Sequence, residues 1–86
     1  MAITNEDIQL VLKAIKKAQN LTNNTYRFLR LRYEDGRERD YLCSRDFHVP
    51  ENRIVELLGK KGTVVKDFEQ DISKTGIAIG LYRWLD

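Results

Sequence analysis

Two glycines that frame two lysines, Gly59-Lys60-Lys61-Gly62, are the residues of this 86-residue chain whose types and spacing best suit binding chemistry. Because glycine has no side chain and tolerates left-handed backbone, a phosphate could approach the peptide N–H groups of this segment closely. The lysines add positive charge, and a helix beginning after Thr63 would point its free N–H groups and positive dipole end to the same place. The four residues therefore predict a site for a phosphate backbone.

A purely structural role accounts for the same four residues. Gly59 would then cap the C-terminus of a helix, and Gly62 would form a turn. Lys60 and Lys61 would keep an exposed tip in water. The sequence alone leaves both interpretations open.

Few residues of the chain could support catalysis. Cys43 and His48 pair a nucleophile with a base near the end of a predicted strand, but a buried thiol and a partly exposed imidazole are the more ordinary arrangement. With Asp46 they supply three potential ligands, fewer than the four of a structural zinc site. The Gly-Lys-Lys-Gly segment lacks the upstream glycine spacing of a nucleotide-binding P-loop. We therefore expect no enzyme activity, no metal and no cofactor.

Composition predicts one small soluble domain over residues 1–86. Hydrophobic residues make up 42% and charged residues 33%, and neither a leader peptide nor a membrane span is apparent. The single cysteine cannot form an internal disulfide, which favours a reducing compartment such as the cytoplasm. A formal net charge of +2 does not by itself imply a nucleic-acid partner, so the positions of the charges must decide.

Hydrophobic periodicity predicts an α+β fold in the order helix, strand, strand, helix, helix, strand. The first helix runs from Thr4, which can cap it with Asp7 in the reciprocal position, to about Asn20. Two runs rich in aromatic and branched residues follow between Tyr26 and Asp46, and they predict a β-hairpin.

The second half of the chain predicts two helices and a strand. One helix begins at Pro50 and ends at Gly59, the next runs from Thr63 to Lys74, and residues 77–85 form a last strand. A right-handed helix-helix crossover would return this strand parallel to the second, giving a three-stranded mixed sheet with helices packed on it. The predicted core comprises Ile8, Val11, Leu12, Ile15, Leu29, Leu31, Ile54, Leu57, Leu58, Val65, Phe68, Ile72, Ile77, Ile79 and Leu81.

The pairing register of the hairpin decides what its arginines do. A two-residue loop at Asp35-Gly36 would place Arg32 opposite Arg39. One face of the hairpin would then gather arginines with aromatic residues, and such a surface suits the stacking of bases and the binding of phosphates.

A three-residue loop with a left-handed Gly36 has a different consequence. It would place Arg32 opposite Glu38 and Arg30 opposite Asp40, so that opposite charges meet across the ladder. Opposed unlike charges stabilise a strand pair, whereas opposed like charges destabilise it. We therefore predict this second register and a hairpin whose arginines are largely neutralised.

Residues 49–62, VPENRIVELLGKKG, resemble the core of a KH domain, in which a Val/Ile-Pro entry leads into an aliphatic helix and a G-x-x-G loop. Val65-Lys66 and Phe68 resemble the opening of that family's second helix, and residues 75–79, TGIAI, resemble its exit into a strand. The element order is similar to the type II arrangement of the fold. The resemblance implies a module that binds single-stranded nucleic acid, RNA more than DNA, by clamping the phosphate backbone beside an apolar groove.

The resemblance also implies which residues form the site. The loop would supply Gly59, Lys60, Lys61 and Gly62. The groove would be formed by Arg53, Ile54, Leu57, Val65, Lys66 and Ile79. The expected partner is single-stranded RNA or DNA.

Two other binding modes fit the same elements. The two predicted helices could form a helix-turn-helix, although the second would expose more acidic residues than lysines, which suits a phosphate-lined groove poorly. Alternatively, the chain is a small protein-interaction or inhibitor domain that uses the hairpin edge, the first helix or the aromatic C-terminus as an interface. Tyr82 and Trp84 alternate there, and packing beneath the first helix is the simpler expectation for both.

Overall fold

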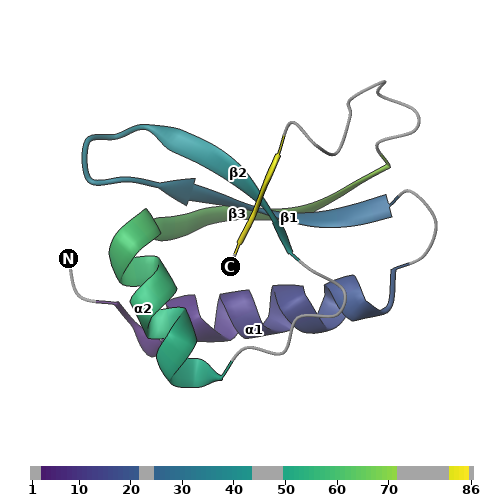
Figure 1. Cartoon of the computed structure of the whole chain (residues 1–86), viewed down its shortest axis with the longest axis horizontal. Helices are drawn as coiled ribbons and strands as arrows, with labels where there is room; N and C mark the ends of the chain where they lie inside the picture. The colour runs from purple at the N-terminus through teal and green to yellow at the C-terminus, as the bar shows by residue number, and fades with distance from the viewer. Residues whose placement is uncertain (1–2, 22–24, 44–49, 72–81, 86) are drawn as a thin grey trace.

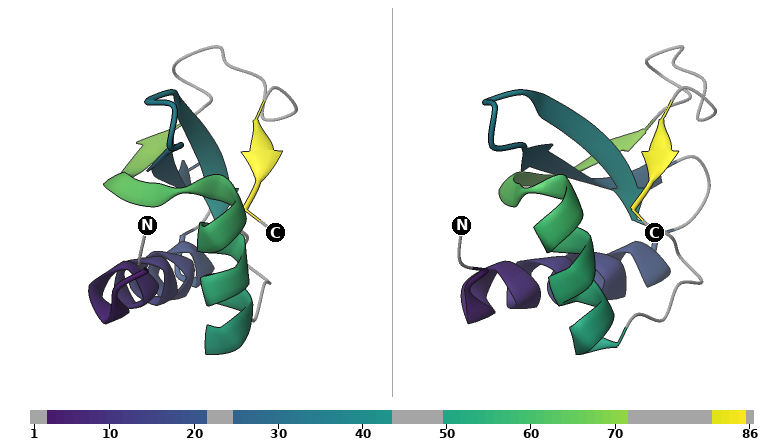
Figure 2. Two further views of the ribbon diagram at one scale, coloured as in Figure 1. Left: turned by 90° about the vertical axis from the view of Figure 1, so that its left-hand side faces the viewer. Right: turned by 60° about the vertical axis from the view of Figure 1, so that its left-hand side comes forward.

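The structure, a computed structural model, describes residues 3–21, 25–43, 50–71 and 82–85. In chain order the elements are α1 (Asn5–Gln19), β1 (Thr25–Arg32), β2 (Glu38–Cys43), α2 (Glu51–Lys61), β3 (Thr63–Asp71) and β4 (Arg83–Trp84). The strands form one mixed sheet in the order β3-β1-β2-β4, and both helices lie on the same side of it (Figures 1 and 2). The α+β prediction is confirmed. Among these elements no helix has the length and apolar character needed to cross a membrane.

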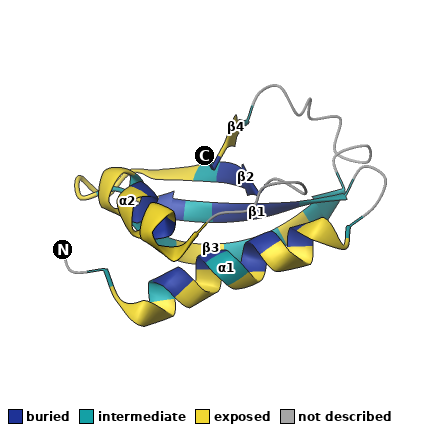
Figure 3. Ribbon diagram, turned by 60° about the horizontal axis from the view of Figure 1, so that its bottom comes forward, coloured by how far each residue is buried: buried dark blue, intermediate teal, exposed yellow. Residues whose placement is uncertain are grey.

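The first helix forms where its capping and periodicity predict it. The Thr4 hydroxyl accepts a hydrogen bond from the backbone N–H of Asp7, and the Asp7 carboxylate accepts one from the backbone N–H of Thr4, which completes a capping box. One face of α1 is buried against the sheet, and the other is exposed (Figure 3). The buried residues are Ile8, Val11, Ala14, Ile15 and Ala18.

The main core lies between the helices and one face of the sheet. It joins the buried face of α1 to Ile54, Leu57 and Leu58 of α2 and to Leu29 and Leu31 of β1, as predicted. Leu12 is partly buried beside this core. Two core predictions are wrong, because Val65 is 38% exposed and Phe68 packs on the opposite face of the sheet. The predicted core residues Ile72, Ile77, Ile79 and Leu81 lie outside the described residues.

The hairpin adopts the register in which opposite charges meet. Arg32 pairs with Glu38 and Arg30 with Asp40 across β1 and β2, and the ion pairs measure 2.6 Å and 2.8 Å. Gly36 in the turn has φ of 88°, the left-handed conformation that this loop was expected to need. The predicted register is confirmed, so these two arginines are already neutralised by carboxylates.

The segment after α2 is a strand, and the predicted third helix is wrong. Residues 63–71 form β3, which pairs antiparallel with β1. The sheet therefore has four strands rather than three, and the helix pair needed for a KH core or a helix-turn-helix is not formed at residues 51–71. Thr63, Val64 and Val65 are β-branched, which favours an extended start to this segment.

Two features of β3 explain why its sequence lacks the alternation of apolar and polar residues that is typical of a strand. Beyond the register shift, the β3 residues on the helix-facing side of the sheet include Asp67 and Glu69. They lie opposite Leu29 and Arg27 of β1. Carboxylates at these positions remove the usual alternation of apolar and polar residues. The register also shifts next to Val65, so that the alternation changes phase within the strand.

A single residue, Gly62, connects α2 to β3. The helix continues through Gly59 to Lys61, so the prediction that Gly59 ends it is wrong. Gly62 has φ of 111°, and its N–H donates to the carbonyl oxygen of Leu58 at 2.8 Å. A methyl group at Gly62 would overlap the carbonyl group of Arg32, at the end of the neighbouring strand.

The last described strand runs parallel to β2, in the predicted direction. Tyr41 pairs with Arg83 and Leu42 with Trp84, and the N–H of Leu85 donates to the carbonyl oxygen of Leu42 at 2.9 Å. Leu85 is buried in the main core. Because neighbouring strand residues alternate between faces, Trp84 lies on the side opposite the helices, and the expectation that it packs beneath α1 is wrong.

Substitution of the two glycines should separate their roles. We expect Gly62→Ala to destabilise the fold by about 3 kcal/mol or more, because it combines a disfavoured backbone conformation with a backbone overlap. Gly59 is helical, and the nearest atom to an added methyl group is the Ile3 side chain at 3.8 Å. Gly59→Ala should therefore stabilise the fold by up to about 1 kcal/mol. Equilibrium unfolding in urea measures both, and equal effects would contradict this assignment.

Candidate nucleic-acid interface

The Gly-Lys-Lys-Gly segment is the last turn of a helix and not an open loop. The N–H groups of its first three residues belong to α2, and the N–H of Gly62 is bonded to Leu58. Lys60 lies 3.9 Å from Glu56, and the Lys61 ammonium group lies over the Tyr41 ring at 4.7 Å. Since the following segment is β3, there is no helix N-terminus at Thr63 to attract a phosphate. The predicted clamp geometry is not formed here.

The cavity beside this helix end is also electrostatically unsuited to an anion. It has a volume of about 420 Å³ and lies between the hairpin turn, the end of α2 and the start of α1. Three carboxylates line it, from Asp7, Glu34 and Asp35, against two cations, from Arg37 and Lys60. Hydrogen bonds from Arg37 hold the pKa of Asp35 below its ordinary value, so this carboxylate stays charged. The balance of charges disfavours a phosphate.

The remaining predicted site residues do not form one groove. Arg53 is exposed on α2 and pairs with Glu56 at 2.9 Å, whereas Ile54 and Leu57 are buried in the core. Val65 is exposed beside the register shift, and Lys66 lies on the sheet face opposite the helices. The predicted groove residue Ile79 lies outside the described residues.

An aromatic cluster occupies the sheet face opposite the helices, and we call this surface the aromatic face. Phe28 of β1 stacks on Phe68 of β3 with ring centroids 5.2 Å apart and planes at 14°. Tyr82 packs against Phe28 at 4.8 Å, and Trp84 meets Tyr26 edge-on at 6.5 Å. Phe28 is fully buried, while the other four rings keep part of their surface exposed. The described helices pack on the other side of the sheet, so they do not cover these rings (Figure 1).

Two cations flank the ring of Phe68 on the aromatic face. The Arg30 guanidinium carbon lies 5.6 Å from the ring centroid, and the Lys66 ammonium nitrogen lies 5.1 Å from it. Arg30 is held by Asp40, whereas Lys66 makes no ion pair with the residues that the structure describes. The face thus combines partly exposed rings with a cation that is free to meet a phosphate.

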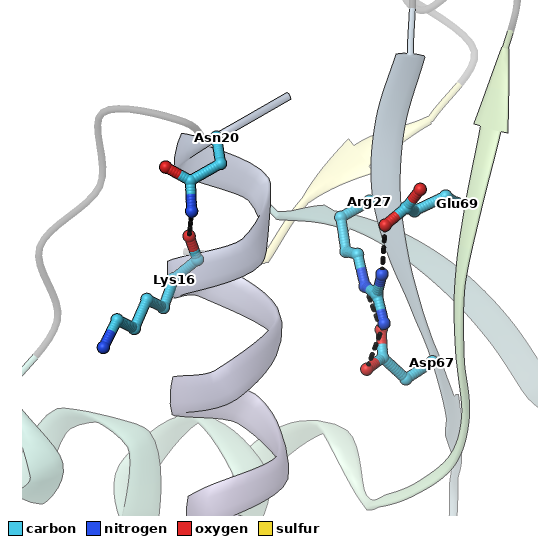
Figure 4. A network of polar contacts seen from close by, with 5 residues as sticks. All are labelled: Lys16, Asn20, Arg27, Asp67 and Glu69. Atoms are coloured by element: carbon cyan, nitrogen blue, oxygen red, sulfur yellow. Dashed lines mark hydrogen bonds and ion pairs between the residues drawn. The ribbon is translucent and has the colours of Figure 1, made fainter. Parts of the chain in front are cut away.

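A nearly buried arginine fixes β3 to β1 on the helix-covered side of the sheet. Arg27 donates from Nε and Nη2 to the two carboxylate oxygens of Asp67 at 2.6 Å and 2.8 Å, and its Nη1 donates to Glu69 (Figure 4). Arg27 is 9% exposed, and its hydrogen bonds to Asp67, followed by the other charge contacts, raise its pKa. The site was not predicted from the sequence, although Arg27 lies on the same face of β1 as the buried Leu29 and Leu31, where a charge requires a partner.

Removal of this arginine should cost far more than removal of an exposed one on the same strand. We expect Arg27→Leu to destabilise the fold by about 3 kcal/mol, because Asp67 would be left in a poorly solvated position without its partner. The matched variant is Arg32→Leu, whose ion pair with Glu38 is solvent-exposed and should contribute less than about 1 kcal/mol. Denaturant unfolding of the two variants measures the difference, and equal losses would show that the Arg27 site contributes no more than a surface pair.

The thiol of Cys43 is poorly suited to nucleophilic chemistry. Cys43 is 1% exposed, and desolvation, followed by the negative charge of Asp67, raises its pKa to about 12. The thiol therefore stays protonated near neutral pH. Its proposed partner His48 and the third potential ligand Asp46 lie outside the described residues, and no group of three metal-ligating side chains occurs within them.

This thiol predicts a loss of stability in alkali. In the unfolded chain Cys43 ionises near its ordinary pKa of 9.0, but in the fold it holds its proton to about pH 12. Its contribution is therefore complete below about pH 9 and falls as the pH rises towards 12. Tyr41, whose pKa burial raises to about 12, should add a similar decline above about pH 10.

Unfolding midpoints between pH 7 and 11 provide the measurement, in the wild type and in Cys43→Ala. We expect a shallower alkaline decline in the variant, with the Tyr41 component retained. Parallel pH profiles for the two proteins would contradict burial of the thiol in its neutral form.

Comparisons of the chain with protein-family models, with curated proteins and with solved structures find no match. A fold does not determine function by itself, which depends on the side chains that its surfaces present.

Proposed function

We propose that this domain binds single-stranded nucleic acid on the aromatic face of its sheet, opposite the two helices. The observation that carries the proposal is the cluster of rings from three strands and the adjoining Tyr82, flanked by Arg30 and Lys66. Sheets that present aromatic side chains on an open face stack unpaired bases, and nearby cations contact the backbone. RNA is the preferred expectation, with single-stranded DNA as the close alternative.

The rings of this surface have two different roles in the proposal. Phe28 is fully buried and supports the cluster from below, because Phe68 and Tyr82 pack on it. Tyr26, Phe68, Tyr82 and Trp84 keep exposed ring surface, and Trp84 is 43% exposed. These four rings are the candidates for stacking. Base stacking tolerates sequence because every base has a π-face, so we expect weak sequence preference.

The electrostatic part of the interaction should be modest. Arg30 and Arg32 on this surface are already paired with Asp40 and Glu38, which leaves Lys66 as the unpaired cation among its described residues. Each phosphate contact changes the logarithmic salt slope by about 0.7 for a single strand. We therefore expect affinity to fall with salt, but with a shallow slope.

The test compares two lysines that differ in position. Lys66→Ala should weaken binding of a short single-stranded oligonucleotide by several-fold to tenfold, because it removes a phosphate contact beside Phe68. Lys60→Ala is the matched control, since this lysine lies at the helix end beside Glu56 and away from the aromatic face. Phe68→Leu should also weaken binding, by roughly tenfold, because it removes a stacking ring. Fluorescence anisotropy of a labelled oligonucleotide measures its affinity for each variant, and thermal unfolding verifies that each variant is folded.

The outcomes separate the possible modes of binding. Loss of affinity in Lys60→Ala with none in Lys66→Ala would contradict the aromatic face and favour the helix end. Absence of any binding by the wild type at low salt would contradict the nucleic-acid proposal altogether. A stoichiometric protein partner recovered without nucleic acid would then favour the protein-interaction alternative.

A further inference from the structure

A second cavity lies where β4 begins beside the edge of β2. It has a volume of about 270 Å³ and is lined by Arg39, Asp40, Tyr41, Tyr82 and Arg83. Arg83 pairs with Tyr41 in the parallel register, and Arg39 lies two residues before Tyr41 on β2, on the same face of the strand. Two arginines from distant parts of the sequence therefore line one cavity.

These two arginines differ from the others on the hairpin. Arg30, Arg32 and Arg37 each have a carboxylate partner, at 2.8 Å, 2.6 Å and 2.6 Å. Arg39 and Arg83 are exposed, and neither forms an ion pair with the residues that the structure describes. Two of the residues that line the cavity are therefore exposed arginines without a carboxylate partner among the described residues.

The one carboxylate in the cavity does not neutralise them. Asp40 accepts hydrogen bonds from Nε and Nη2 of Arg30 at 2.8 Å and 3.3 Å. Its charge is therefore already balanced by an arginine of the neighbouring strand β1. Burial raises the pKa of Tyr41 to about 12, so this phenol adds no negative charge near neutral pH. The local balance is two unpaired positive charges, which suits an oxyanion.

We propose that this cavity binds a phosphate group, held by the guanidinium groups of Arg39 and Arg83. A planar guanidinium can donate two parallel hydrogen bonds to phosphate oxygens, and such charge-assisted bonds are among the stronger ones in proteins. Inorganic phosphate and a phosphodiester share this chemistry.

The cavity adjoins the surface of the proposed function through one residue. Tyr82 lines the cavity and also packs against Phe28 at 4.8 Å on the aromatic face. Arg39 and Arg83 alternate to the face of Tyr41, so a strand stacked on Tyr82 would pass around the edge of the sheet to place a phosphate between them. In this form the inference rests on the proposed function and identifies the phosphodiester of a bound strand as the ligand, at the edge of the sheet formed by β2 and β4.

The experiment removes the positive charges of Arg39 and Arg83, and it compares the effect with removal of an arginine that already has a carboxylate partner. The variants are Arg39→Gln, Arg83→Gln and their combination, and the matched control is Arg37→Gln, an exposed arginine that is already paired with Asp35. We expect each single variant to bind a short single-stranded oligonucleotide roughly tenfold more weakly, with a logarithmic salt slope smaller by about 0.7. Arg37→Gln should retain the wild-type affinity and slope.

A second measurement separates this inference from the proposed function. Pyrophosphate is titrated into the wild-type protein while NMR follows the side-chain Nε–H signals of Arg39, Arg83 and Arg37. Selective shifts of the first two support the cavity even if no oligonucleotide binds, an outcome that would overturn only the proposed function. If oligonucleotides bind but the Arg39 and Arg83 variants behave like Arg37→Gln, the inference is overturned and the proposed function stands. Absence of selective shifts together with absence of oligonucleotide binding also overturns the inference.

Discussion

The reversal of the chain at Gly62 determines how the second half of this fold can pack. A helix that ends at Lys61 must enter a strand at Thr63, and only a residue without a side chain fits against the Arg32 carbonyl with φ of 111°. The reversal places β3 beside β1, and β1 thereby becomes a central strand with partners on both sides. The ion pairs of Arg27 and the stacking of Phe28 on Phe68 both require β1 beside β3, so both depend on this connection.

The pairing of β1 with β3 links the two faces of the sheet. On the helix-covered face, Arg27 binds Asp67 and Glu69, and on the opposite face Phe28 stacks on Phe68. The ion pairs and the stacked rings alternate along the same two strands, so each set constrains the register that the other needs. The buried charges thus hold in place the rings that we propose contact bases, without touching a ligand themselves.

The parts of the fold that could be predicted are those where local patterns agree with the final packing. The Thr4–Asp7 capping box, the apolar face of α1 and the charge pairing of the hairpin each involve residues close in sequence. Strand β3 could not be predicted in this way, because Asp67 and Glu69 occupy positions that appear polar until Arg27, 40 and 42 residues away, is placed beside them. The site predicted at the Gly-Lys-Lys-Gly segment was wrong for the same reason, because its geometry depended on a helix at residues 63–74. Gly59 and Gly62 suggested a loop between helices, but one became helical and the other a turn into a strand.

The availability of an arginine depends on its strand neighbours and cannot be judged from net charge. The chain carries fifteen lysines and arginines against thirteen acidic residues, yet the hairpin register neutralises Arg30 and Arg32 locally. Arg39 alternates to the other face of β2, the face of Tyr41, and it lines one cavity with Arg83, the β4 residue that pairs with Tyr41. Two arginines exposed in one cavity repel each other, although solvent screens much of that repulsion. A bound anion would relieve this repulsion, and we therefore propose a phosphate at the edge of the sheet and not at the helix end, where Lys60 lies beside Glu56 and Lys61 over the ring of Tyr41.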